Sequence, residues 1–153
     1  NMYGKTIAEN RAARHEYFID ETVETGIVLD GGEVKSVRGG SVNLKDSFCL
    51  VAGNAVFLKN AHIAVYDKAG AFNARDAKRD RKLLLHKKEI LRLRQRVEQK
   101  GCTLVPLRLY YKDALIKVEL GVCRGKHTYD KKKTLMEKDV RRKAEREIKE
   151  YSR

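Results

Sequence analysis

Residues Arg79–Lys88 read RDRKLLLHKK, so basic side chains stand on both sides of a short apolar run. The leucines favour burial, whereas the surrounding lysines and arginines favour water or a polyanion. Beyond Leu85 the apolar residues recur at intervals of three and four as far as Val97. That period predicts an amphipathic helix, which Gly101 ends.

The positive charge of the chain is concentrated in two segments. Residues 75–100 hold eleven Lys and Arg against four Asp and Glu, and residues 124–153 hold twelve against six. All other residues balance at eleven against eleven, so these two segments carry the formal net charge of +13. A basic charge gathered in this way is typical of a protein whose partner is a nucleic acid.

The length of 153 residues and the apolar content of 42% predict one domain with a modest core, followed by a basic tail. No apolar run reaches the roughly 18 residues of a membrane helix, and the N-terminal residues lack the apolar centre of a signal peptide. We therefore expect a soluble cytoplasmic protein with no membrane segment. Asn1, which precedes Met2, is interpreted as the remnant of an expression tag.

Six segments have the β-branched, aromatic or alternating apolar residues that favour strands. They are residues 17–29, with a bend at Gly26, and residues 46–51, 54–58, 61–66, 103–111 and 115–122. Antiparallel strands of this size usually close into a barrel, because closure removes exposed edges. The predicted fold class is therefore mainly β, a six-stranded antiparallel barrel with flanking helices.

Three shorter segments carry more specific expectations. Residues 6–14 are expected to be a helical turn or a loose arm, and residues 33–38 a single helical turn. Gly39 or Gly40 would end that turn in the left-handed conformation. Pro106 has no backbone N–H to donate, so it predicts a sheet edge or a bulge.

The cysteines are scattered along the chain. Cys49, Cys102 and Cys123 have neither CxxC spacing nor a histidine at the spacing of a metal site. We therefore expect buried free thiols in a reducing compartment, with no metal and no cofactor. No Ser/His/Asp or GxSxG pattern points to a catalytic nucleophile.

Residues 125–153 form the basic tail. Its apolar residues fall on one helical line, but this stripe is about one residue wide and cannot offset an ordering cost of about 1–2 kcal/mol per residue. We predict a tail that is disordered when free and helical on a polyanionic partner. A charged helix packed on the barrel is the alternative.

Five blocks of the chain occur in the order of a known family. They are NRAARHEYFIDETVETGI (10–27), EVKSVRGGSVNLKDSF (33–48), RKLLLHKKEI (81–90), GCTLVPLRLYYKDALIKVELGVCRGK (101–126) and a tail that bears DKK (130–132). Together they resemble the small protein B family, the bacterial binding partner of transfer-messenger RNA. The resemblance implies an OB-like barrel over residues 10–124, between an N-terminal arm of residues 1–9 and the tail of residues 125–153.

The resemblance also implies a function in ribosome rescue. A member of this family binds the tRNA-like domain of transfer-messenger RNA and accompanies its alanyl form, with elongation factor Tu, to a stalled ribosome. The tail would occupy the vacant decoding centre of the small subunit and the messenger channel. We therefore expect a monomeric RNA-binding protein that is not an enzyme.

The predicted RNA-binding residues combine the matched motifs with the cluster of basic side chains. They are Asn10, Glu24, Glu33, Lys35, Arg38, Arg81, Lys82, Leu84, His86, Lys87 and Lys88. The lysines and arginines would meet phosphates, whereas a carboxylate at Glu24 would accept from base N–H donors and so discriminate. In the tail, the residues aligned with the family's decoding-centre element are Tyr129, Asp130, Lys131 and Lys132, the last in place of an expected arginine.

Several of these residues have a second interpretation. Asn10 either reads base edges or caps a helical turn, and Glu24 is otherwise an exposed strand carboxylate. Leu84 is most simply a core residue. His86 stacks on or bonds to RNA, or else caps the following helix.

Two other functions compete with this interpretation. A general single-strand RNA binder would use Phe57, Tyr110 and Tyr111 as stacking platforms, although core positions suit them better. An RNA-cleaving enzyme would hold Mg²⁺ on Asp20, Glu21 and Glu24, although a strand places successive side chains on alternate faces.

Overall fold

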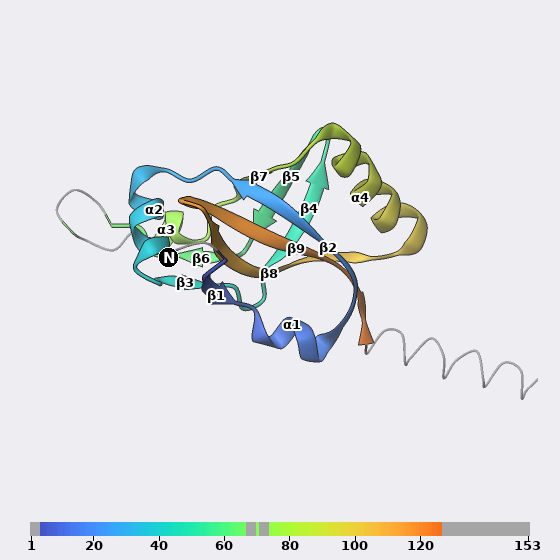
Figure 1. Ribbon diagram of the computed structural model, residues 1–153, viewed down its shortest axis with the longest axis horizontal. Coiled ribbons are helices and arrows are strands. Elements are labelled where there is room, and N and C mark those ends of the chain that lie inside the picture. Colours follow the sequence, from blue (N-terminus) through green and yellow to red (C-terminus); the bar gives the residue numbers. More distant parts are fainter. Residues whose placement is uncertain (1–3, 67–69, 71–73, 127–153) are drawn as a thin grey trace, which may run out of the picture.

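The computed structural model describes residues 4–66, 70 and 74–126, which form strands and short helices (Figure 1). The strands are β1 (Thr6–Glu9), β2 (Tyr17–Ile27), β3 (Val42–Asn43), β4 (Phe48–Ala52), β5 (Ala55–Lys59), β6 (His62–Ile63), β7 (Arg81–Leu84), β8 (Thr103–Lys112) and β9 (Leu115–Gly125). The helices are α1 (Arg11–Glu16), α2 (Gly31–Arg38), α3 (Ala74–Ala77) and α4 (Lys87–Lys100).

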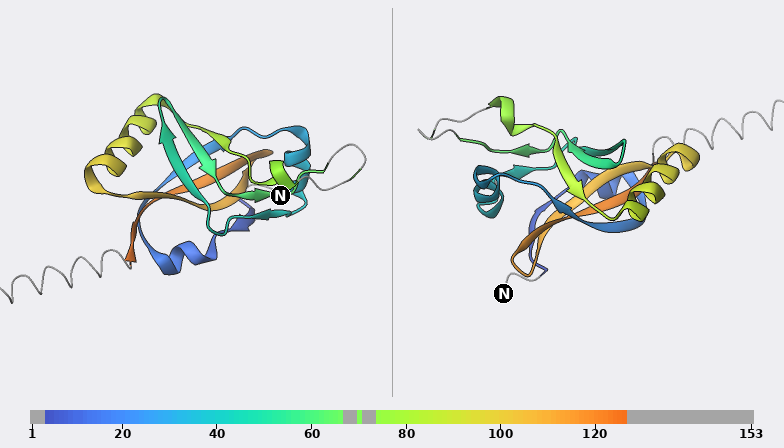
Figure 2. Two further views of the ribbon diagram at one scale, coloured as in Figure 1. Left: turned by 180° about the vertical axis from the view of Figure 1, so that it is seen from behind. Right: turned by 90° about the horizontal axis from the view of Figure 1, so that it is seen from above.

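Six strands of the described chain close into an antiparallel ring. Their order is β8-β4-β5-β7-β2-β9, and pairing of β9 with β8 closes it, while β1 adds to the outer edge of β8. The mainly β, barrel-type fold predicted from the sequence is therefore confirmed. Helix α4 lies at one end of the barrel, and α2 and α3 lie at the other (Figures 1 and 2).

The ring includes one strand that the sequence did not identify and omits one that it did. Residues 61–66 were expected to be a barrel strand, but only His62–Ile63 forms a strand, and it pairs with β3 in a separate small sheet. The sixth place in the ring belongs to β7, which lies between β5 and β2. Thr6–Glu9, assigned to an N-terminal arm, instead forms β1 against β8, so the sheet begins before residue 10.

Leucine and valine side chains from opposite strands fill the interior of the ring. Leu58, Leu83, Leu109 and Val118 are all buried, and each leucine contributes about 1.5–3 kcal/mol relative to an exposed one. Strand β9 alternates as predicted, because Val118 and Leu120 point inward while Lys117 and Glu119 remain partly exposed. The predicted burial of the three free cysteines is also confirmed.

Turns and irregularities appear near the predicted places. Gly40 and Gly101 both have left-handed backbone, with φ of 80° and 65°, after the ends of α2 and α4. The β8–β9 pairing shifts register between Pro106 and Arg108, so Pro106 lies beside a bulge rather than at an edge. Strand β2 is continuous through Gly26 and pairs with β9 up to this residue and with β7 from it onward.

A substitution at Gly121 tests how tightly β8 and β9 are packed. A Cβ atom at this residue would lie 2.9 Å from Leu107 Cδ1 and 3.0 Å from Cys123 Sγ, and Leu107 is buried. We expect Gly121→Val to lower the free energy of unfolding by about 1–3 kcal/mol in urea titrations. Gly31→Ala is the matched control, because no atom lies within 4 Å of its added Cβ; an equal loss in both variants would contradict the packing described here.

Candidate nucleic-acid interface

The alternation of β7 divides the RDRKLLLHKK stretch between core and surface. Arg81 and Leu83 are buried, whereas Lys82 and Leu84 point outward. Leu84 is 51% exposed, so its interpretation as a core residue is wrong. His86 then precedes α4, and its backbone N–H donates to the Glu89 carboxylate over 3.1 Å. The exposed residues of this stretch therefore continue directly into the helix.

An open groove of about 570 Å³ lies between β2, β9 and the β7–α4 junction. It brings together three of the predicted RNA-binding residues, Glu24, Leu84 and His86. The other residues that line it are Thr22, Val23, Gly26, Leu85, Glu89, Arg92 and Lys117. The groove thus combines two carboxylates, Glu24 and Glu89, and an exposed leucine with basic side chains from β9 and α4.

Gly26 allows the two sides of this groove to meet. A Cβ atom at Gly26 would lie 3.1 Å from the Leu84 Cβ, which is tighter than most real contacts between such atoms. Because Gly26 has no side chain, β2 can pair there with both β7 and β9 while Leu84 packs beside it. The close approach keeps Glu24 and Leu84 on the same open surface.

Glu24 is held on this surface by two residues that the sequence did not connect to it. The Tyr110 hydroxyl donates to Oε1 over 2.8 Å, and Lys112 Nζ donates to Oε2 over 2.9 Å. The hydrogen bond from Lys112, followed by that from Tyr110, lowers the pKa of the Glu24 carboxyl. Its side chain is 39% exposed, so the ionised carboxylate remains accessible to a ligand.

Glu33 and Arg81 lie inside the protein, and neither side chain is exposed. Arg81 Nε donates to Glu33 Oε2 over 2.6 Å, and the same guanidinium donates to the backbone carbonyls of Ala61 and Ala77. Arg79 also donates to both carboxylate oxygens of Glu33. Neither side chain reaches the surface, so the structure does not place Glu33 and Arg81 on the predicted RNA-binding face.

This ion network joins α2 to β7. Burial by itself would raise the pKa of Glu33, but hydrogen bonds from Arg79, from the Asp30 backbone N–H and from Arg81 outweigh it, and the pKa is lowered. Asp30 caps α2 in return, since its Oδ1 accepts from the Glu33 N–H over 2.8 Å. The network therefore fixes the helix that carries two predicted phosphate contacts, Lys35 and Arg38, both of which are exposed.

Asn10 has the capping role that was one of its two interpretations. Its Oδ1 accepts from the Ala13 N–H over 3.3 Å at the start of α1, and its Nδ2 donates to the Pro106 carbonyl over 2.9 Å. The residue is only 6% exposed, so the structure does not present it as a reader of base edges.

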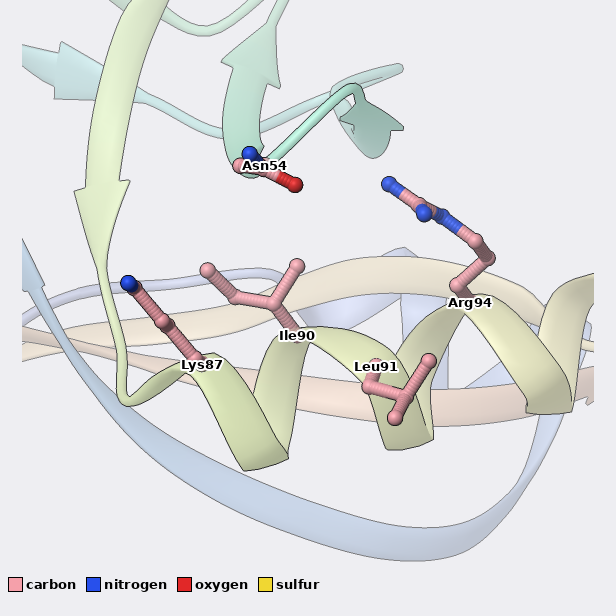
Figure 3. A pocket seen from close by; sticks show the side chains of 5 residues that line it. All are labelled: Asn54, Lys87, Ile90, Leu91 and Arg94. Atoms are coloured by element: carbon pink, nitrogen blue, oxygen red, sulfur yellow. The ribbon is translucent and has the colours of Figure 1, made fainter.

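Lys87 and Lys88 are exposed at the first turn of α4. Lys87 lines a second, smaller hollow of about 150 Å³ with Ile90, Leu91 and Arg94, across from Asn54 on the β4–β5 turn (Figure 3). Glu89 and Arg92 line the main groove instead, so Lys87 belongs to a different side of the helix. The predicted tail residues Tyr129, Asp130, Lys131 and Lys132 lie outside the described residues.

The described residues form neither the aromatic platform of a general single-strand RNA binder nor the carboxylate cluster of a Mg²⁺-dependent RNA-cleaving enzyme. Tyr110 and Tyr111 are buried and Phe57 is half-buried, so they do not form an open stacking platform. Asp20, Glu21 and Glu24 pair with Arg124, Arg92 and Lys112, respectively. No group of three or more possible metal-binding side chains converges within residues 4–66, 70 and 74–126.

None of the helices in that part of the chain has the length and apolar character needed to cross a membrane.

Comparison with known proteins places the chain in a family. A family model described as "SmpB protein" matches residues 7–150. The chain belongs to the SmpB family. A relative called "SsrA-binding protein" from Clostridium perfringens is 52% identical over 149 residues, which cover 97% of this chain and 95% of the relative. Another of the same name, from Caldicellulosiruptor bescii, is 55% identical, with 97% of this chain and 94% of the relative covered.

A solved structure of the SmpB family also has this fold. It is described as "tmRNA-SmpB: a journey to the center of the bacterial ribosome" and is 51% identical to this chain. The two superpose with a TM-score of 0.64, over 78% of this chain and 83% of that one. The family resemblance inferred from the sequence is therefore confirmed.

The buried ion network predicts a specific dependence of stability on pH. Glu33→Gln leaves two arginines without their carboxylate partner, so we expect the free energy of unfolding to fall by about 3–5 kcal/mol at neutral pH. Because the pKa of Glu33 is lowered in the folded protein, its stabilisation is complete above the ordinary pKa of about 4 and is lost as pH falls through the folded value.

Urea titrations between neutral and acidic pH test both statements. The variant should lose less of its remaining stability on acidification than the unmodified protein does. Glu98→Gln, an exposed change on α4, should alter stability by less than about 0.5 kcal/mol. Equal losses at Glu33 and Glu98 would show that the network does not stabilise the fold.

Proposed function

We propose that this protein binds the tRNA-like domain of transfer-messenger RNA and delivers it to stalled ribosomes for trans-translation. The observation that carries the proposal is the groove that joins Glu24, Leu84 and His86 on a strongly basic protein of the SmpB family. The names of the relatives support it, since they refer to SsrA binding and to a tmRNA–SmpB assembly at the ribosome.

The exposed cations and Glu24 have different tasks in this proposal. Lys35, Arg38, Lys82, Lys87 and Lys88 attract RNA through its phosphates, which gives affinity that falls with salt but carries little sequence information. Glu24 repels phosphate and can accept from base N–H donors, so it contributes to discrimination rather than to attraction. Leu84 and His86 supply an apolar contact and a planar ring beside it.

The buried residues of the predicted set act indirectly. Glu33 and Arg81 hold α2 against β7, and Asn10 holds the start of α1 against β8. Protein and RNA then associate without catalysis, in keeping with the separate cation partners of Asp20, Glu21 and Glu24. We further propose a cytoplasmic monomer that works alongside elongation factor Tu bound to the alanyl form of the RNA.

The basic tail has its own role in the proposal. Tyr129, Asp130, Lys131 and Lys132 begin a segment that enters the vacant decoding centre and continues along the messenger channel. Six positive charges in excess over residues 124–153 suit a binding site lined by ribosomal RNA.

Competition binding tests the proposed RNA partner. We expect a transcript of the tRNA-like domain to displace a labelled copy at least about tenfold better than an unrelated RNA of equal length, at fixed salt. Lys82→Gln should weaken the binding of both RNAs alike and reduce the slope of log affinity against log salt by about one. Glu24→Gln should instead reduce the preference for the tRNA-like transcript. If the unmodified protein shows no preference between the two RNAs, the proposal fails.

Truncation after Tyr129 tests the division between barrel and tail. We expect nearly unchanged affinity for the tRNA-like domain, because the groove and the exposed cations remain, but loss of peptide tagging on ribosomes stalled at the end of a broken message. The full chain, assayed in parallel, is the control. Loss of RNA affinity together with tagging would contradict a separate role for the tail.

A further inference from the structure

We propose that Tyr110 and Lys112 are positioning residues that orient the Glu24 carboxylate and thereby set how well the groove distinguishes its RNA from others. This inference rests on the proposed function, since it assigns the selectivity of the same groove. Tyr110 and Lys112 lie 86 and 88 residues from Glu24 in the sequence, yet each binds one of its two oxygens. Rotation of the carboxylate would therefore break one or both of these hydrogen bonds.

The sheet register explains how these side chains meet. Glu24 on β2 lies opposite Glu119 on β9, and Glu119 lies opposite Arg108 on β8. Tyr110 lies opposite Lys117 on the same face of the sheet, so its hydroxyl reaches over β9 toward Glu24. Three adjacent strands therefore supply one connected set of polar side chains.

The ring of Tyr110 is itself fixed. Arg108 lies over it, with the guanidinium carbon 4.1 Å from the ring centroid, and Arg108 is held in turn by Glu119 at 2.5 Å and by the Thr6 hydroxyl at 3.2 Å. Tyr110 is only 8% exposed. Burial, and after it the hydrogen bond to Glu24, raises the pKa of Tyr110, so the phenol stays protonated and donates.

The stability of the fold does not by itself explain why residue 24, which lies opposite Glu119, is a glutamate. Glu24 and Glu119 are directly opposite on neighbouring strands, and like charges in that relation are destabilising. Arg108 forms an ion pair with Glu119, and Lys112 forms one with Glu24. The hydrogen bonds from Lys112 and Tyr110 lower the pKa of Glu24, which keeps that carboxylate ionised. Each oxygen of Glu24 keeps a lone pair for another donor. A fixed, ionised and accessible acceptor suits the N–H donors on the edge of an unpaired base.

Removal of one hydroxyl group tests the inference. We expect Tyr110→Phe in the full chain to lower the preference for the tRNA-like transcript over the unrelated RNA by about three- to tenfold, with affinity for the unrelated RNA unchanged. Tyr111→Phe removes the neighbouring buried hydroxyl and should leave the preference unchanged. In a Glu24→Gln background, Tyr110→Phe should cause no further loss, because its effect passes through the carboxylate.

A pH series distinguishes positioning from a general structural effect. The hydrogen bonds from Lys112 and then from Tyr110 lower the pKa of Glu24, so without the phenol the carboxylate takes up a proton at higher pH. The acid limit of the RNA preference, which is the pH below which the preference is lost, should therefore be higher in Tyr110→Phe than in the unmodified protein. The other titratable or charged groups that face Glu24 are present in both proteins, namely Lys117 and Glu119 from β9 and His86, Glu89 and Arg92 from the α4 side of the groove.

The outcomes separate this inference from the proposed function. If the unmodified protein prefers the tRNA-like transcript but Tyr110→Phe keeps both the preference and the acid limit, the inference is overturned and the proposed function stands. If the unmodified protein has no preference, the proposed function itself fails. Should Tyr110→Phe not fold, Lys112→Met provides the same test at a more exposed residue, with the same two readouts.

Discussion

The buried ion pair between Arg81 and Glu33 is the constraint on which the surface of this protein depends. Burial of two charges is costly unless each finds full compensation, and here the guanidinium donates to a carboxylate and to three backbone carbonyls. The pair joins helix α2 to β7, the strand between β5 and β2, beside a core made mostly of apolar side chains. As a result, α2 and β7 have one relative arrangement, and the exposed residues of both elements keep defined places.

The groove arises from the same strand. Since Arg81 and Leu83 point inward, Lys82 and Leu84 point outward, and the chain then enters α4 at His86. Gly26 on the neighbouring strand leaves room for Leu84, so Glu24 lies on the same surface. In the proposed function, electrostatic attraction and base discrimination therefore belong to different side chains of one short stretch and its neighbours.

Local sequence patterns were sufficient for much of the fold but not for the site. The period of α4, its end at Gly101 and the alternation of β9 depend on neighbouring residues, and all three were predicted correctly. The burial of Arg81 depends on a carboxylate 48 residues earlier. The three leucines that follow it are consecutive, so they have no alternating pattern from which to predict whether Arg81 points into the barrel or toward solvent. Likewise, the partners of Glu24 on β8 depend on strand register, which no local pattern determines.

The shortest strand pairing in the barrel lies between β4 and β8. Strands β4 and β8 share a single register pair, Cys49 with Leu104, and a hollow along this seam is lined by Cys49 and Cys102 under the end of α4. Burial raises the pKa of Cys49, which keeps that thiol unreactive while the seam is shut. Cys49 and Cys102 are both 6% exposed, so a thiol reagent would modify them only when the β4–β8 pairing opens.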